Sequence, residues 1–224
     1  IGAVFALAQH DLKRLLAYHS IENIGIIGMG IGLGCLGLGG ENQLLVVAGF
    51  GGALLHTLNH SLFKSLLFYG AGNVYQATQT MNIESLGGLM KRIPRTAYLF
   101  LIGSLAICGL PPFNGFVSEF FIYSGLFKGL ASNQFLFPLT MLFSILSLVL
   151  IGGLALICFT KAFGIVFLGK SRMESEANKI NKKPLTVMPL YAVVVVILII
   201  GVLPFLFSES LLKIIGLFPV NTEI

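Results

Sequence analysis

The chain has 224 residues, of which 56% are hydrophobic and only 10% charged, with a net charge of +5 and a mean hydropathy of +0.92. This composition excludes a soluble globule, which needs more polar residues at its surface, and predicts a membrane protein with several crossings. The lysines and arginines gather at the ends of apolar runs, which membrane topology explains better than nucleic-acid binding. Because the chain opens inside an apolar run, we expect it to be a piece of a longer protein.

The first complete span is predicted over residues 15–38, after a short polar turn at residues 10–14. His19 lies near its start, Glu22 roughly two turns in, and glycines recur through the rest of the span. Glycines weaken a soluble helix, whereas in a membrane they let helices approach closely. We therefore expect a tightly packed transmembrane helix, with Glu22 and His19 as secondary candidates for a proton relay.

The next span, residues 44–75, contains three ionisable side chains at intervals of four residues: His56, His60 and Lys64. A lysine at the bilayer centre costs about 2.5–3.5 kcal/mol on insertion scales, so it needs a partner or a polar cavity. Each step of four residues turns a helix by about 40°, which places the three groups on one stripe. An imidazole has an unperturbed pKa of about 6.5, so it can gain and lose a proton near neutral pH. Bridging waters would connect the three groups, and the stripe therefore indicates a proton relay. A purely structural interpretation also stays open, in which His60 and Lys64 cap buried carbonyls or pair with a carboxylate.

Residues 96–130 form two apolar halves around Pro111 and Pro112. Proline removes a backbone donor and clashes with the preceding turn, so we predict a helix that breaks at mid-membrane. Such breaks are tolerated where the freed backbone lines protein or a wet cavity, as in the ion sites of transporters. Glu119 follows the break and is a candidate proton site, or an interfacial carboxylate if the prolines form a full loop.

Charge placement favours one broken crossing over two separate crossings for residues 96–130. A single crossing puts the loops at residues 10–14, 76–95 and 170–184 on one side of the membrane. The basic residues of these loops are Lys13, Arg14, Lys91, Arg92, Arg95, Lys170, Arg172, Lys179, Lys182 and Lys183. Only Lys128 and Lys213 fall on the other side. This asymmetry predicts a multi-pass protein of the inner (cytoplasmic) membrane whose basic loops are cytoplasmic.

Two further spans are predicted, over residues 135–168 and 185–207. Lys161 lies near the cytoplasmic end of the first, where its long side chain either reaches the headgroups or forms an exit for the relay. The second span contains no titratable side chain, so we expect it to have a structural role. We assign residues 1–207 to one transmembrane domain and residues 208–224 to an amphipathic tail on the opposite membrane surface.

No cofactor or metal site is expected on this chain. Cys35, Cys108 and Cys158 each sit alone in apolar sequence, without the pairs or Cys/His clusters of zinc and iron–sulfur sites. The chain also has no Gly-rich nucleotide loop and no nucleophile–base constellation in an aqueous segment. We therefore expect no redox or hydrolytic site here, whatever complex the chain serves.

Four segments follow one another in the chain, namely DLKRLLAYHSIENIGII, LNHSLFKSLLFYGAG, IESLGGLMKRIP and SLAICGLPPFNGFVSEF. In this order they resemble the antiporter-like proton-translocating subunits shared by respiratory complex I, membrane-bound hydrogenases and multisubunit cation/proton antiporters. Within that family, ENIGI, LNHSLFK and PPFNGFVSE are most similar to the large membrane subunits of the formate-hydrogenlyase and hydrogenase 4 type. The resemblance implies an all-α transmembrane bundle built as two inverted five-helix repeats, of which this chain holds the second. Without the upstream repeat, the piece alone is not expected to be a complete proton path.

The same resemblance implies roles for individual residues. Lys64 matches a proton carrier, His60 and His56 match relay positions, and Glu119 matches a gated exit site toward the outer side. The implied function is a proton-translocating membrane subunit of a redox-driven ion pump, of the NADH:quinone oxidoreductase or hydrogenase type. Its implied partners are other membrane subunits and, through them, a hydrophilic redox arm. Two alternatives remain, namely a sodium/proton antiporter subunit of the same fold and a non-conducting membrane anchor.

Overall fold

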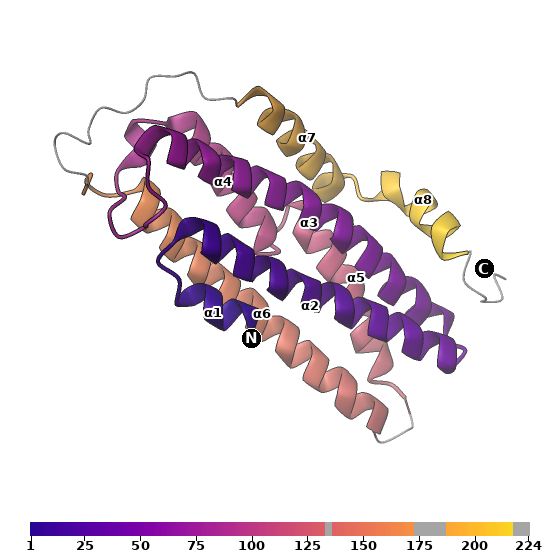
Figure 1. The fold of residues 1–224 in the computed structure, drawn as a ribbon. Helices are drawn as coiled ribbons and strands as arrows, with labels where there is room; N and C mark the ends of the chain where they lie inside the picture. Colours follow the sequence, from indigo (N-terminus) through magenta and orange to yellow (C-terminus); the bar gives the residue numbers. More distant parts are fainter. Residues whose placement is uncertain (133–135, 173–186, 217–224) are drawn as a thin grey trace.

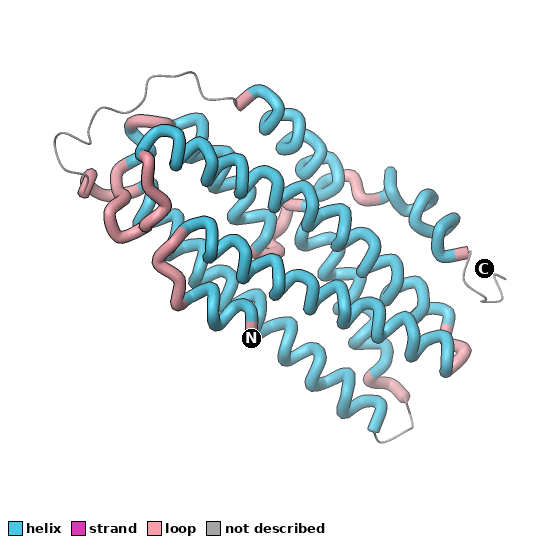
Figure 2. The backbone as a smooth tube through the Cα atoms, in the orientation of Figure 1, coloured by secondary structure: helices cyan, strands magenta, loops and turns pink. Residues whose placement is uncertain are grey.

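The structure, a computed structural model, describes residues 1–132, 136–172 and 187–216. Within these ranges the chain is a bundle of α-helices without a β-strand, and its segments run largely along one common direction (Figures 1 and 2). Helices α2 (Leu12–Gly39) and α6 (Leu136–Phe167) are each long and apolar enough to cross a membrane. The prediction of an all-α transmembrane bundle is confirmed.

The remaining elements follow the predicted order, with shifted ends. They are α1 (Gly2–Leu7), α3 (Gln43–Thr78), a short 3-10 turn (Leu89–Lys91), α4 (Pro94–Ile107), α5 (Asn114–Gly129), α7 (Met188–Val202) and α8 (Phe205–Ile215). Helix α2 begins inside the segment predicted as a polar turn, because the Asp11 side chain accepts a hydrogen bond from the Arg14 N–H at 2.9 Å and caps the helix. Asn42 caps α3 in the same way.

Helices α2 and α3 lie side by side over most of their length (Figure 1). A Cβ atom at Gly34 would stand 2.7 Å from the Phe50 ring, and one at Gly49 would overlap the backbone of Gly34. Glycine is therefore required on both helices for this approach. By contrast, Gly25 and Gly28 have open space where a Cβ would point. The predicted tight packing thus rests on one face of the glycine-rich helix.

The break between α4 and α5 is present where the prolines predicted it. Helix α4 ends at Ile107, ahead of Pro111 and Pro112, and α5 begins at Asn114. Gly109 holds the left-handed backbone conformation (φ 63°) that redirects the chain. The two halves together run from one end of the bundle to the other, as one interrupted crossing (Figure 1).

Three loops meet at one end of the bundle, the end shown at the upper left in Figure 1. The backbone N–H of Leu12 donates to Met81 O at 2.9 Å, that of Ile83 to His10 O at 2.8 Å, and that of Gly88 to Leu168 O at 2.9 Å. These hydrogen bonds join the loops around residues 10–12, 79–93 and 168–172, which the sequence placed on one side of the membrane. Lys179, Lys182 and Lys183 lie outside the described residues.

The last predicted span is shorter in the structure than in the sequence analysis. Helix α7 ends at Val202, and α8 begins at Phe205 after Pro204, with the two axes bent by 94°. Helix α8 then packs back on α3, where Ile215 joins a buried cluster with Val46 and Phe50. The amphipathic segment therefore starts before residue 208, and residues 217–224 lie outside the described part.

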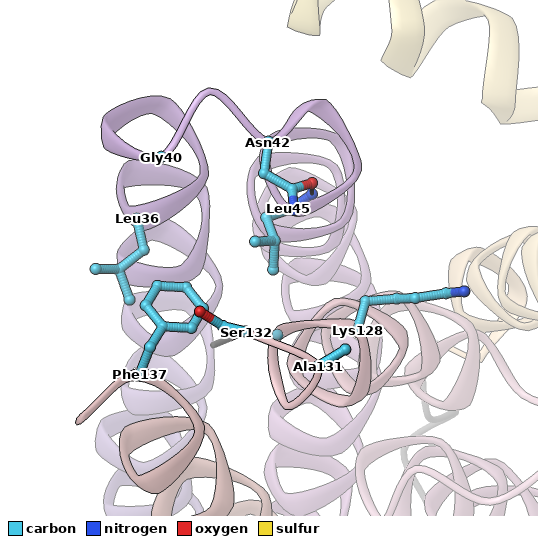
Figure 3. A pocket seen from close by; sticks show the side chains of 9 residues that line it. Leu36, Gly40, Asn42, Leu45, Lys128, Ala131, Ser132 and Phe137 are labelled. Carbon is cyan, nitrogen blue, oxygen red and sulfur yellow. Dashed lines mark hydrogen bonds between the residues drawn. The ribbon is translucent and has the colours of Figure 1, made fainter. Parts of the chain in front are cut away.

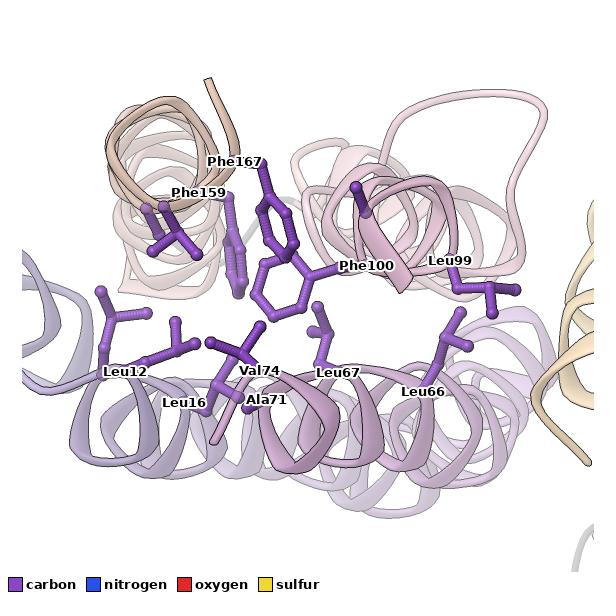
Figure 4. Packing of buried hydrophobic residues seen from close by; sticks show 14 of the residues in the cluster. Leu12, Leu16, Leu66, Leu67, Ala71, Val74, Leu99, Phe100, Phe159 and Phe167 are labelled. Atoms are coloured by element: carbon purple, nitrogen blue, oxygen red, sulfur yellow. The ribbon is translucent and has the colours of Figure 1, made fainter. Parts of the chain in front are cut away.

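A cluster of large apolar side chains fixes α3 against α4 and α6 (Figure 4). Leu67 of α3, Phe100 of α4 and Phe167 of α6 are each almost completely buried, and the two phenylalanine rings lie 5.2 Å apart. Of the buried polar side chains of α3, His56, Asn59 and Lys64 contact α2 and α5, whereas Asn73 donates to Thr96 of α4.

Candidate functional site

Lys64 is 5% exposed and points from α3 toward α2. Its amine donates a hydrogen bond to the carbonyl of Leu16, and the ring of Phe68 lies 5.5 Å from Nζ. Glu22 of α2 is near enough to Lys64 to interact with it electrostatically. The buried amine therefore has the hydrogen-bond acceptor that a buried polar group requires.

Glu22 and His19 form a buried pair on one face of α2. Their exposures are 6% and 0%, and His19 Nδ1 contacts Glu22 Oε2. The His19 ring packs on Phe159 of α6 at 4.6 Å between ring centroids. Packing of α6 over this part of α2 buries the His19 side chain completely. The i, i+3 spacing of the two residues was the signal that they share a face.

Glu119 lies against the break in the α4–α5 crossing. A Cβ atom at Gly109 would stand 2.6 Å from Glu119 Oε2, so the carboxylate occupies the space that the glycine leaves free. Glu119 also interacts electrostatically with Glu22. Glu22, ranked second in the sequence analysis, thus lies within electrostatic reach of both Lys64 and Glu119.

A hydrogen-bonded polar network joins α2, α3 and α5 around His56. The imidazole contacts Asn23 Oδ1 through Nε2 at 3.1 Å and Ser118 Oγ through Nδ1 at 2.9 Å. Asn59 Nδ2 donates to Ser118 Oγ at 3.0 Å and to Asn114 O at 2.8 Å, and Asn114 Nδ2 donates to Asn59 Oδ1 at 3.1 Å. All five residues are buried. Sequence reasoning singled out His56 alone as a site residue; isolated small polar residues in apolar helices were the signal available for Asn59 and Ser118.

His60 and Lys161 stand apart from these contacts. His60 is half-buried, its ring lies edge-on to Phe63 at 5.6 Å, and its Nε2 is buried without a hydrogen-bond partner among the described residues. Lys161 of α6 is also half-buried, and its amine donates to the carbonyl of Leu7 at the end of α1, at 2.9 Å. On α3, His56 and Lys64 therefore have hydrogen-bond partners on neighbouring helices, whereas His60 Nε2 has none among the described residues.

Two cavities of the described bundle are lined by other residues than these groups. One of about 280 Å³ opens at the α2–α3 turn, and the Lys128 side chain at its rim runs away from it (Figure 3). The other, about 260 Å³, lies between α4 and α6 and has mainly apolar walls, including Cys108 and Phe159. Over residues 1–132, 136–172 and 187–216, no three His, Cys, Asp or Glu side chains are grouped to hold a metal ion.

Comparison with known proteins adds the family context. Residues 1–147 match the protein family described as "NADH:quinone oxidoreductase/Mrp antiporter, TM". Two curated relatives come from Escherichia coli (strain K12). Formate hydrogenlyase subunit 3 is 43% identical over 178 residues, which cover 80% of this chain and 29% of that protein. Hydrogenase-4 component B is 41% identical over 200 residues, which cover 88% of this chain and 30% of that protein.

Among solved structures, a chain of the membrane-bound sulfane sulfur reductase, an archaeal respiratory membrane complex, superposes with a TM-score of 0.73 at 24% identity. The match covers 96% of this chain and 39% of that one, and at this identity it speaks for the fold alone. The chain thus spans about 30% of the length of the curated relatives described above.

Proposed function

The chain belongs to the NADH:quinone oxidoreductase/Mrp antiporter transmembrane family, and on this premise we propose that it forms part of a proton path in a redox-driven ion pump. The pump would be of the complex I-like or membrane-bound hydrogenase type. The observation that carries the proposal is the burial of Lys64, Glu22 and His19 inside the bundle, on the neighbouring helices α3 and α2. Buried ionisable groups in a membrane are costly, and they mark ion and proton pathways in many membrane proteins.

The proposed path uses the groups that the helices hold inside the bundle. Lys64 is the central carrier, Glu22 with His19 connects it to Glu119, and Glu119 is the gated exit at the break. His56, His60 and Lys161 are the further candidates, with waters bridging the gaps between side chains. The upstream repeat, other membrane subunits and a hydrophilic redox arm would complete the pump, and the lipid bilayer surrounds the chain.

Charge coupling is strong enough to move protons along such a path. Two unit charges about 8 Å apart interact by roughly 2 kcal/mol at an effective dielectric constant near 20. That energy changes the protonation equilibrium of either group by a factor of about 30. A change of charge at one end of the path, driven by redox chemistry in a partner subunit, would therefore shift the proton held at Lys64 and then at Glu119.

The test is Lys64→Met in the complete parent complex, with proton translocation and electron transfer measured in the same inverted membrane vesicles. We expect at least about a tenfold loss of proton translocation per electron transferred, because the neutral side chain removes the central carrier. Lys128→Met, at an exposed lysine of α5, is the matched control and should retain wild-type translocation. Unchanged translocation in Lys64→Met refutes the proposal and favours a non-conducting membrane anchor.

A sodium/proton antiporter subunit is the second candidate, because the family description also includes the Mrp antiporter. In that case Glu119 would help to bind the cation at the broken helix. Proton flux that requires external sodium separates this candidate from the redox-driven pump, whose flux should follow electron transfer at any sodium concentration.

A further inference from the structure

We propose that Ser118 is a positioning residue for His56, whose hydroxyl lets the imidazole gain and lose a proton without moving any helix. The proposal rests on the proton path proposed above, and it names the residue through which a proton would pass between α3 and α5. It follows from counting donors and acceptors in the buried network of His56, Asn23, Ser118, Asn59 and Asn114.

Two asparagines have fixed orientations. Asn23 Nδ2 donates to the backbone carbonyl of His19 at 2.8 Å, and a carbonyl can only accept, so Asn23 Oδ1 faces His56. Likewise, Asn59 Nδ2 donates to the carbonyl of Asn114 and uses its second proton on Ser118 Oγ. His56 Nε2 must therefore carry a proton in every state, and only Nδ1 can gain or lose one.

Ser118 can serve both forms of His56 by turning its O–H bond. When His56 is neutral, the hydroxyl donates to Nδ1, which lies 2.9 Å from Oγ. When His56 is charged, Nδ1 donates to Oγ, and the hydroxyl proton turns to the carbonyl of Gly115, 3.0 Å away. Oγ has two lone pairs, one for Asn59 and one for His56, so each donor keeps an acceptor in both forms.

All three helices of the network carry titratable groups. His60 and Lys64 lie on α3, Glu22 lies on α2, and Glu119 follows Ser118 directly on α5. Any proton that reaches His56 Nδ1 from the α5 side meets Ser118 Oγ first. The serine thus connects the imidazole to the helix that carries the exit carboxylate.

The test compares Ser118→Thr with Ser118→Val in the complete complex. These variants have nearly the same shape, so the added methyl group affects both equally, and only threonine keeps the hydroxyl. At about pH 7.5, and compared at equal amounts of assembled complex, we expect Ser118→Thr to translocate protons about tenfold faster than Ser118→Val. The reason is that valine leaves the charged imidazole with a buried donor that has no acceptor, which is strongly disfavoured. Ser124→Thr and Ser124→Val, at a serine on the outer part of α5, are the matched pair and should not differ.

The pH dependence separates a proton-linked role from a merely structural hydrogen bond. The deficit of Ser118→Val should shrink as pH falls, because a higher proton concentration drives the imidazolium to form, whereas a structural hydrogen bond gives a ratio independent of pH. Equal flux in the two variants, or a constant ratio, overturns the role of Ser118. If Lys64→Met still abolishes translocation in that case, the proton path stands and only the serine contact falls.

Discussion

At the scale of single residues, insertion cost and spacing identified the groups that are unusual in a bilayer, but not their partners. Lys64, His56 and Glu119 could be selected because charge in an apolar helix is costly. Whether Lys64 meets the Leu16 carbonyl depends on how α2 and α3 are rotated against each other. The i, i+4 pattern holds no information on that rotation, so it could not identify the groups on α2 that lie closest to Lys64.

Gly109→Ala tests whether the position of the Glu119 carboxylate at the break matters. The added Cβ would stand 2.6 Å from Glu119 Oε2, and alanine at a φ of 63° costs about 1–2 kcal/mol. We expect proton translocation per assembled complex to fall roughly tenfold as the carboxylate is displaced. Gly152→Ala on α6, where nothing lies within 4 Å of the new Cβ, is the control. Equal flux in both variants would show that the position of Glu119 at the break is unimportant.

At the scale of elements, the sequence predicted the features that depend on a few neighbouring residues. The break between α4 and α5 follows from proline stereochemistry, and the structure has it in the expected segment. The start of α8 was placed too late, although Pro204 is a local signal, because the apolar run continues past it to Phe207. Likewise, Asp11 was read as part of a turn although it is the cap of α2.

Gly49→Leu tests the close contact of α2 and α3. The side chain has no room against the backbone of Gly34, so we expect the helices to separate and the yield of assembled complex to drop at least about fivefold. Gly28→Leu adds the same atoms to α2 where no atom lies within 4 Å of the new Cβ. Blue native electrophoresis of solubilised membranes measures both variants, and equal yields would contradict a glycine-dependent contact.

At the scale of the whole molecule, the basic loops and the buried groups define a polarity for the bundle. Loops around residues 10–12, 79–93 and 168–172 meet at one end, and α5, which carries Lys128 in its last turn, runs toward the other end (Figure 1). The sequence predicted this grouping because the charges of the loops decide membrane topology, and those charges can be read from the sequence directly. We propose that the basic end faces the cytoplasm, that residues 1–207 form one domain and that the described segment beyond them, which continues α8 to Ile215, lies at the opposite surface.

Cysteine labelling tests this orientation. In a Cys35→Ser background, which removes the exposed native cysteine, Lys91→Cys and Lys128→Cys place single exposed thiols at the two ends. A membrane-impermeant maleimide should label Lys91→Cys in inside-out vesicles and Lys128→Cys in right-side-out vesicles. The reverse pattern would invert the orientation, and labelling of both from one side would contradict a single broken crossing.

The central claim is that Glu22 links Lys64 to Glu119, and Glu22→Gln tests it most directly, because the amide keeps the shape of the side chain and removes its charge. The measurement is the number of protons translocated per electron transferred by the assembled complex, with Glu84→Gln at an exposed loop position as the control. The account predicts at least about a tenfold fall for Glu22→Gln and no change for Glu84→Gln. An unchanged ratio in Glu22→Gln, with Lys64→Met inactive, would contradict a path through Glu22.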